Sequence, residues 1–266
     1  MALDTWFPLA IYYTDLPEAS AHKLTLLKAA LDLKERGFEA RNYEARAWTG
    51  DIHGVERIHQ DDRFAWIVAQ VEIHTRQYLT ELGLDLSQLD LYIQRSWPVI
   101  SRYGEEVGPH SHPTSHISAV YYISVPNSGS EEAGCLVFFD DDRRNEVSPG
   151  LGSDNTEVFT EWNVLNQDQA SYAPTEGRLI VFPSKQRHAV TPNETEGDRI
   201  SVSFDIVLTA KEGIAAGSYE FLTPPPTAWK RFTQNPAIAP PPFESATPHP
   251  MSTPAPSSGD SNSKSY

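Results

Sequence analysis

The chain of 266 residues has little cysteine, few basic side chains and no cluster of them. Its one cysteine, Cys135, cannot form a disulfide within the chain, and it stands in the apolar run CLVFF, where a small core side chain is expected. Lys and Arg number 21 against 36 Asp and Glu, which gives a net charge of −15. Such a chain is a poor partner for the phosphates of nucleic acids or for anionic lipids.

Long apolar runs are also missing. No stretch approaches the roughly 18 uninterrupted apolar residues of a membrane-spanning helix, and the N-terminus has no basic segment before its short apolar part, which Pro8 interrupts. We therefore expect a soluble, cytoplasmic protein that binds neither nucleic acid nor membrane. Its oligomeric state is not indicated. With 39% hydrophobic and 11% aromatic residues, the chain can build a folded core.

Two amphipathic helices are predicted in the first third of the chain. In residues 18–37, Ser20 is a candidate N-cap, Gly37 a candidate terminator, and the stripe consists of Leu24, Leu27, Ala30, Leu31 and Lys34. In residues 61–83, Gly83 ends the pattern, and the stripe consists of Phe64, Ile67, Val68, Val71, Tyr78 and Leu82. His74 lies near this second stripe, where a structural histidine is the ordinary interpretation. Both helices are expected to be packing elements.

From about residue 88 the pattern changes to short β-strands separated by turns. The predicted strands are LDLYIQRSWPVISRY, HISAVYYISVP, AGCLVFFD, GRLIVFPS and RISVSFDIVL, with NSGSEEAG and PNETEGD as loops. Several strands alternate apolar and polar residues, so one face is apolar and the other polar. This pattern predicts a β-sandwich or small barrel.

The composition changes again after residue 222. More than half of the chain's 21 prolines lie in the last segment, whose end is mostly Ser, Pro, Thr and Gly. We expect one folded domain over residues 1–222, with a helical bracing part in 1–87 and a β core in 88–210. Residues 223–266 are expected to form a disordered or loosely docked tail.

Histidines gather in the sequence HSHPTSH, at the start of a predicted strand. His110 and His112 are two residues apart, so on extended backbone both side chains point the same way, as two ligands of one ion must. A distant third ligand is available in His188, after the strand RLIVF. Arg199 begins the next strand with Ser201 on the same side, which is suited to a bidentate pair with a carboxylate.

The order of these motifs resembles that of the Fe(II)/2-oxoglutarate-dependent oxygenases. The resemblance is closest to a 2OG-Fe(II) oxygenase branch with prolyl-hydroxylase-like features, through HSHPTSHISAVYYISVP, FFDDDR and RHAVTPNETEGDRISVSF. It covers roughly residues 42 to 207. It implies a double-stranded β-helix (a jelly roll of the cupin-like kind) braced by α-helices, which agrees with the strands predicted above. It also implies an enzyme that uses Fe(II) and 2-oxoglutarate and releases succinate and CO2.

By the same resemblance, His110 and His188 match iron ligands, and Arg199 with Ser201 matches the clasp for the distal carboxylate of 2-oxoglutarate. Tyr122 resembles a strand tyrosine that hydrogen-bonds this carboxylate in prolyl-hydroxylase-like members. The departure is His112, because most of the superfamily has Asp or Glu there. Either three histidines bind the iron, which we favour, or a carboxylate comes from elsewhere, with Asp141 the candidate.

Other residues near these motifs have ordinary interpretations. His116 is either a ligand or a cap outside the strand, the run Asp140, Asp141 and Asp142 is more typical of a solvated turn, and Trp97 is either core or part of a substrate pocket. We expect a dioxygenase that hydroxylates an amino acid, a peptide or protein side chain, or a small metabolite. The alternatives are a cupin-like three-histidine metal enzyme that does not use 2-oxoglutarate, and a binding module without catalysis on the same fold.

Overall fold

The computed structural model describes residues 3–38, 45–126, 133–148, 158–211 and 222–230. The chain divides after Ala228 into two units, Met1–Ala228 and Trp229–Tyr266. Most of the tail predicted for 223–266 lies outside the described residues. No helix in the described part has the length and apolar character that a bilayer crossing requires.

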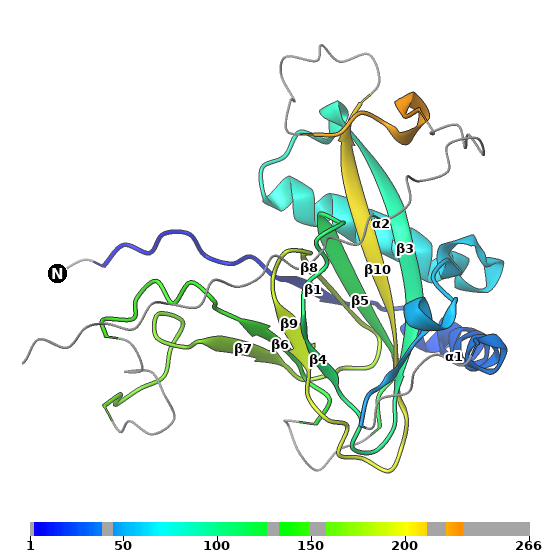
Figure 1. The fold of residues 1–266 in the computed structure, drawn as a ribbon, viewed down its shortest axis with the longest axis horizontal. Helices are drawn as coiled ribbons and strands as arrows, with labels where there is room; N and C mark the ends of the chain where they lie inside the picture. Colours follow the sequence, from blue (N-terminus) through cyan, green and yellow to red (C-terminus); the bar gives the residue numbers. More distant parts are fainter. Residues whose placement is uncertain (1–2, 39–44, 127–132, 149–157, 212–221, 231–266) are drawn as a thin grey trace, which may run out of the picture. The chain divides into compact units, whose positions relative to one another are not determined.

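The first unit contains two antiparallel sheets (Figure 1). The large sheet has the strand order β1-β8-β5-β10-β3-β2, and the small sheet has the order β4-β9-β6-β7. The strands of the large sheet are β1 (Tyr12–Asp15), β2 (Trp48–Thr49), β3 (Leu89–Ser101), β5 (Ile117–Ser124), β8 (Arg178–Pro183) and β10 (Arg199–Ala210). Those of the small sheet are β4 (Val107–His110), β6 (Leu136–Phe139), β7 (Gln169–Tyr172) and β9 (His188–Val190).

The α-helices α1 (Ala19–Arg36) and α2 (Ala65–Glu81) pack on the large sheet. Short 3-10 helices connect the elements: η1 (Gly50–His53), η2 (Ile58–Gln60), η3 (Asp62–Phe64), η4 (Leu86–Gln88) and η6 (Pro226–Ala228). The buried side chains of both helices join those of the sheet in one large apolar core. This core lies on the outer face of the large sheet, opposite the face that meets the small sheet (Figure 1).

The apolar stripe predicted for α1 is partly on the wrong face. Leu24 is 60% exposed and Leu31 is 38% exposed, whereas the buried side chains are Leu26, Ala29 and Ala30. Leucines occur on several sides of this helix, so their spacing alone does not select a face, and packing against β5 decides it.

The ends of the helices were predicted with mixed success. Helix α1 begins after Glu18 without a side-chain cap, so Ser20 lies inside the first turn and the predicted N-cap was wrong. Gly37 does end α1, because its N–H donates to the carbonyl oxygens of Leu33 and Lys34. Gly83 follows α2 with a φ of 83°, a conformation that glycine adopts without strain.

The stripe predicted for α2 is largely confirmed. Its buried residues are Ile67, Val71, Thr75, Tyr78 and Leu79, and Phe64 directly before the helix is fully buried. Leu82, just past the helix, is 44% exposed and was wrongly included. His74 is structural, since its Nδ1 lies 2.8 Å from the hydroxyl of Tyr12 on β1.

Strict alternation along β10 separates the two faces of the large sheet. Ile200, Val202 and Phe204 belong to the outer core, so the residues between them, Arg199, Ser201, Ser203 and Asp205, face the small sheet. On this inner face a second apolar cluster joins the two sheets, with Tyr122, Ile180 and Phe182 from the large sheet and Leu136, Phe138 and Val190 from the small one.

A register shift in β3 changes which of its residues face inward. Ile93 pairs with Ile206 and Arg95 pairs with Asp205, so Gln94 is an extra residue on β3. A bulge of this kind reverses the alternation after it. Arg95 and Trp97 therefore face the inner side of the sheet, beside Asp205, although Leu91 and Ile93 pack against the outer core.

The five long strands predicted from the sequence are β3, β5, β6, β8 and β10, within a few residues at each end. The loop PNETEGD lies between β9 and β10 as expected, and most of NSGSEEAG lies outside the described residues. Cys135 is buried, as predicted. The short strands β1, β2, β4, β7 and β9 were missed, because two to four residues carry too little alternation to be recognised.

Candidate metal and co-substrate site

Three histidines from separate segments meet between the sheets. His110 ends β4, His112 lies in the connection to β5, and His188 begins β9. Strands β4 and β9 pair with His110 opposite His188, which brings two distant parts of the sequence together. One ring nitrogen from each histidine lies within 4.8 Å of the others, a spacing that could hold a metal ion. Asp141 is not a member of this group.

Hydrogen bonds fix the orientation of all three imidazoles. Nδ1 of His110 lies 2.8 Å from the carbonyl oxygen of Gly108, and Nδ1 of His188 lies 2.9 Å from the carbonyl oxygen of Gln186. Nδ1 of His112 lies 2.9 Å from Oδ1 of Asp205. Since each partner is an acceptor, we assign the proton to Nδ1 in every ring. Each Nε2 then keeps a lone pair for a metal.

Burial keeps the rings of His110 and His188 neutral. Loss of hydration lowers the pKa of His188 to about 3, and the neighbouring His110 adds to the effect. Burial also lowers the pKa of His110. A neutral imidazole is the form that binds a metal. The group therefore offers three imidazole donors, with a buried carboxylate directly behind His112.

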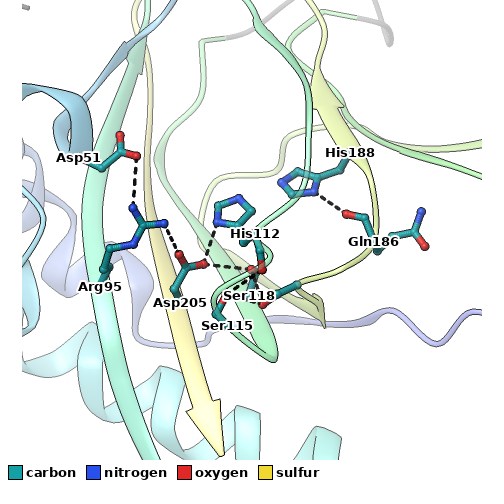
Figure 2. Close-up of polar contacts among 9 residues, drawn as sticks. Asp51, Arg95, His112, Ser115, Ser118, Gln186, His188 and Asp205 are labelled. Atoms are coloured by element: carbon teal, nitrogen blue, oxygen red, sulfur yellow. Dashed lines mark hydrogen bonds and ion pairs between the residues drawn. The ribbon is translucent and has the colours of Figure 1, made fainter. Parts of the chain in front are cut away.

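That carboxylate belongs to Asp205, which is fully buried on the inner face of β10. Its Oδ1 accepts hydrogen bonds from Nδ1 of His112 and from the hydroxyl of Ser118 at 3.2 Å. Its Oδ2 lies 2.7 Å from a guanidinium nitrogen of Arg95, which also points toward Asp51 (Figure 2). Although burial alone would raise the pKa of Asp205, His112 and Arg95 lower it below its ordinary value.

Sequence analysis gave no role to Asp205 or Arg95. Asp205 stands in the predicted strand RISVSFD at the same parity as Arg199 and Ser201, so an acid on an inward-facing strand position was a visible signal. Its partner Arg95 was not visible, because the bulge at Gln94 decides that it faces inward.

Arg199 stands at an inward-facing position of β10 and is linked to the histidine group through aromatic rings. Its side chain is 2% exposed, its Nη1 lies 3.5 Å from the hydroxyl of Ser201, and its guanidinium lies 4.9 Å from the centroid of the Tyr122 ring. Ser201 and Tyr122 are cross-strand partners. The ring of Tyr122 packs with Phe138 and Phe182, which both contact the ring of His188.

The Arg199 group has unused hydrogen-bonding atoms. Among the residues that the structure describes, no carboxylate pairs with Arg199, and its Nε and the hydroxyl of Tyr122 are buried without a partner. Burial raises the pKa of Tyr122, so this hydroxyl keeps its proton. A buried cation with an unpaired hydroxyl beside it suits an anionic ligand such as a carboxylate.

Gly134 leaves room for this arginine. A Cβ at position 134 would lie 2.8 Å from Cδ of Arg199, and the residue has a φ of 66°. A side chain there would require both a strained backbone and a displaced arginine.

The remaining candidates lie outside the two groups. Asp141 is exposed and forms a bidentate ion pair with Arg187, with Nε 2.8 Å from Oδ1. His116 is exposed, and its Nδ1 accepts the backbone N–H of Leu208 at 2.9 Å, so it caps a strand. Trp97 is buried and stacks on the ring of His112, at 5.7 Å between centroids.

The acidic turn after β6 is held by ion pairs. Asp142 pairs with Arg144, whereas Arg143 pairs with Glu146 and Asp168. These contacts are solvent-exposed, which is the ordinary interpretation of such a run.

Comparisons with known proteins agree with this geometry. Residues 95–205 match the family model described as "Putative 2OG-Fe(II) oxygenase", and the match contains all three histidines together with Arg199, Ser201 and Tyr122. This part of the chain, which holds most of the β core, is thus similar to the 2OG-Fe(II) oxygenases. No sequence among curated proteins matches it.

Solved structures show the same fold at low identity. The α-ketoglutarate-dependent carbocyclase SnoK from nogalamycin biosynthesis has a TM-score of 0.51 and 14% identity, covering 81% of this chain and 87% of its own. The epimerase SnoN from the same pathway has a TM-score of 0.50 and 16% identity, covering 76% and 82%. The two facing sheets with bracing helices are therefore the double-stranded β-helix of these enzymes, as predicted.

Proposed function

We propose that the protein binds one ferrous ion through His110, His112 and His188 and binds 2-oxoglutarate through Arg199, and that it oxidises a C–H bond of a substrate. One observation supports this proposal above the others. Among the described residues, three imidazoles with ring nitrogens within 4.8 Å of one another are joined, through the rings of Tyr122 and Phe182, to a buried guanidinium that has no carboxylate partner. The donor set and the orphaned cation suit a metal and an anionic co-substrate respectively.

The residues of the chain have separate tasks in this proposal. The hydrogen bonds to the Nδ1 atoms hold the three imidazoles toward one point, so that little reorganisation is needed when iron binds. Arg199 holds the distal carboxylate of 2-oxoglutarate, with the hydroxyls of Ser201 and Tyr122 as further donors. Iron and 2-oxoglutarate together supply the activation of O2, with release of succinate and CO2.

We propose hydroxylation of a small molecule, an amino acid or a peptide as the reaction. SnoN and SnoK are named as an epimerase and a carbocyclase, so the shared fold also supports other outcomes of C–H oxidation. The net charge of −15 disfavours nucleic acid and anionic membranes as partners. We further propose a cytoplasmic location, because the chain has one cysteine and it is buried as a thiol.

The direct test is anaerobic titration of the purified protein with Fe(II), followed by turnover of 2-oxoglutarate in air. We expect one iron per chain and formation of succinate that requires both iron and 2-oxoglutarate. Candidate substrates are then screened by mass spectrometry for the gain of one oxygen atom. The variant His188→Ala is expected to lose iron, because it removes one of three donors. A wild-type protein without stoichiometric iron would favour the binding module instead.

The variant Arg199→Ala separates this function from that of a cupin-like enzyme without 2-oxoglutarate. The three-histidine set by itself suits both. We expect the variant to keep iron and to bind 2-oxoglutarate about 100-fold more weakly, since a buried charged hydrogen bond is worth roughly 3 kcal/mol. Arg178→Ala is the matched control, because this arginine pairs with Asp15 at the sheet edge. Equal affinity for 2-oxoglutarate in both variants would reject the role of Arg199.

A further inference from the structure

Among the described residues, one buried carboxylate touches the histidine group, and it is not a ligand candidate. Asp205 lies behind His112, on the far side of the imidazole from the nitrogen that remains free (Figure 2). The ring of His112 lies between this carboxylate and the ring of His188, which stacks on it at 5.2 Å between centroids (Figure 2). The resemblance noted from the sequence implies a carboxylate ligand where this chain has His112.

We propose that Asp205 is a positioning residue that takes over the charge of the missing carboxylate ligand and delivers it to the metal through His112. This inference rests on the proposed iron site. Asp205 acts by fixing the proton of His112 on Nδ1, so that Nε2 faces the metal, and by placing a negative charge one ring away. A carboxylate behind a ligating histidine raises the basicity of the ligand nitrogen.

The local geometry is built to hold this carboxylate in one orientation. Oδ1 faces His112 and Ser118, while Oδ2 faces Arg95, so the carboxylate cannot rotate without losing several hydrogen bonds. The bulge at Gln94 turns Arg95 inward to reach it. Trp97, the next inward residue of β3, and His188 both stack on the ring of His112. The ring is thus held by a hydrogen bond at Nδ1 and by two stacking contacts.

Stability alone is a weak reason for such an arrangement. Burying a charged pair costs hydration that its mutual attraction barely repays, and apolar replacements of similar volume often stabilise a protein. The partner Arg95 keeps 33% of its side chain exposed, so its charge is not the one that needs burial. The fully buried member is the carboxylate, and it contacts the metal group through its bond to His112.

The test is the affinity for Fe(II) alone, measured by anaerobic titration of Asp205→Asn. This variant keeps the shape of the side chain and removes its charge. We expect iron to bind about 10- to 100-fold more weakly, the usual effect of losing such a partner. Ser118→Ala is the matched control, because it removes another buried contact to the same oxygen while leaving the charge and the His112 bond. It should bind iron within about threefold of wild type.

The midpoint potential of the bound Fe(III)/Fe(II) couple gives a readout that a merely structural role would not move. Loss of a nearby negative charge favours the ferrous state, so Asp205→Asn should raise the potential and Ser118→Ala should not. If both variants weaken iron equally and leave the potential unchanged, Asp205 is only structural and the proposal is rejected. If wild type binds no iron, the proposed function itself fails, which is a different result.

A measurement on the wild-type protein covers the case that the variant does not fold. In the Zn(II)-loaded protein, nitrogen-15 NMR should find the proton of His112 on Nδ1 and the metal on Nε2. Coordination through Nδ1 would overturn the proposal, because Asp205 then has no proton to hold.

Discussion

The two faces of the large sheet are formed by the same strands but have different roles. On the outer face, β10 contributes Ile200, Val202 and Phe204 to a core that the helices cover. On the inner face, the residues between them include Arg199 and Asp205, both buried and both charged. The same backbone thus carries the apolar surface that stabilises the fold and the polar groups of the candidate site.

The difference shows how such a site can be held rigid. Asp205 stands between Phe204 and Ile206 of the outer core, and Arg199 stands next to Ile200, so neither backbone can move without disturbing the packing beneath. The inner face therefore holds charged side chains away from water. Such buried charges must be paired with one another or with ligands. Stability should therefore respond mainly to the outer face, and ligand binding mainly to the inner one.

The largest change in stability is expected from a substitution on the outer face. Phe204 is fully buried in the outer core, and Phe204→Ala should lower the free energy of unfolding by about 3 to 5 kcal/mol through lost burial and a residual cavity. Urea unfolding of the iron-free protein measures it. The neighbouring Ser203→Ala, which changes a small inward residue, should have a much smaller effect.

Iron affinity of the folded Phe204→Ala protein is the second measurement on this variant. We expect it to stay within about threefold of wild type, because Phe204 contacts no histidine of the group. A parallel loss of iron affinity and stability would show that the two faces are not separable.

The sequence predicted much of the outer face and less of the inner one. Alternation along β10 and β5 and the stripe of α2 follow from periodic burial, so they were visible without a structure. The buried face of α1 was not visible from the sequence, because the helix carries leucines on several of its sides. In the structure, the small side chains of Ala29 and Ala30 are buried where α1 packs against β5.

At the site, sequence motifs led to the three histidines, whose ring nitrogens lie within 4.8 Å of one another, and to Arg199, whose role as a ligand-binding residue stays a prediction. Their mutual approach depends on the pairing of β4 with β9, two strands too short to be recognised. The role of Asp205 depends on Arg95, which a bulge in β3 turns inward, and no local sequence pattern indicates this bulge. Long-range register, more than residue type, is what sequence reasoning lacked here.

The next prediction concerns pH and the inner face. His188 has a folded pKa of about 3 against an ordinary value of 6.5, so between these values the unfolded chain binds a proton that the folded iron-free protein does not. The free energy of unfolding therefore falls as pH decreases from 6.5. His188 alone should lower the free energy of unfolding by about 2 kcal/mol at pH ~5, and it should have no such effect above pH ~7.

Urea unfolding at about pH 7 and about pH 5 measures this loss, and His188→Gln isolates it. Other histidines with lowered pKa, including His110, add to the wild-type change, so the difference between wild type and variant is the quantity of interest. His116→Gln is the control, since this side chain is exposed. An equal dependence on pH in wild type and His188→Gln would contradict the prediction.

The smallest expected effect belongs to the exposed acid beside the site. Asp141 was the alternative carboxylate ligand, but it forms a bidentate pair with Arg187, and this hydrogen bonding lowers its pKa. Because a carboxylate held by a guanidinium in solvent is satisfied where it is, Asp141→Asn should leave iron affinity within about twofold of wild type. Anaerobic Fe(II) titration of this variant measures it.

The paired variant His112→Ala makes this last test decisive. His112 offers a buried ring nitrogen with Asp205 behind it, whereas Asp141 would have to leave Arg187 before it could reach the metal. We therefore expect His112→Ala to lose iron while Asp141→Asn retains it. The reverse pattern would mean that iron draws Asp141 out of its ion pair, and the negative charge at the metal would then come from a direct ligand rather than from Asp205 through the imidazole.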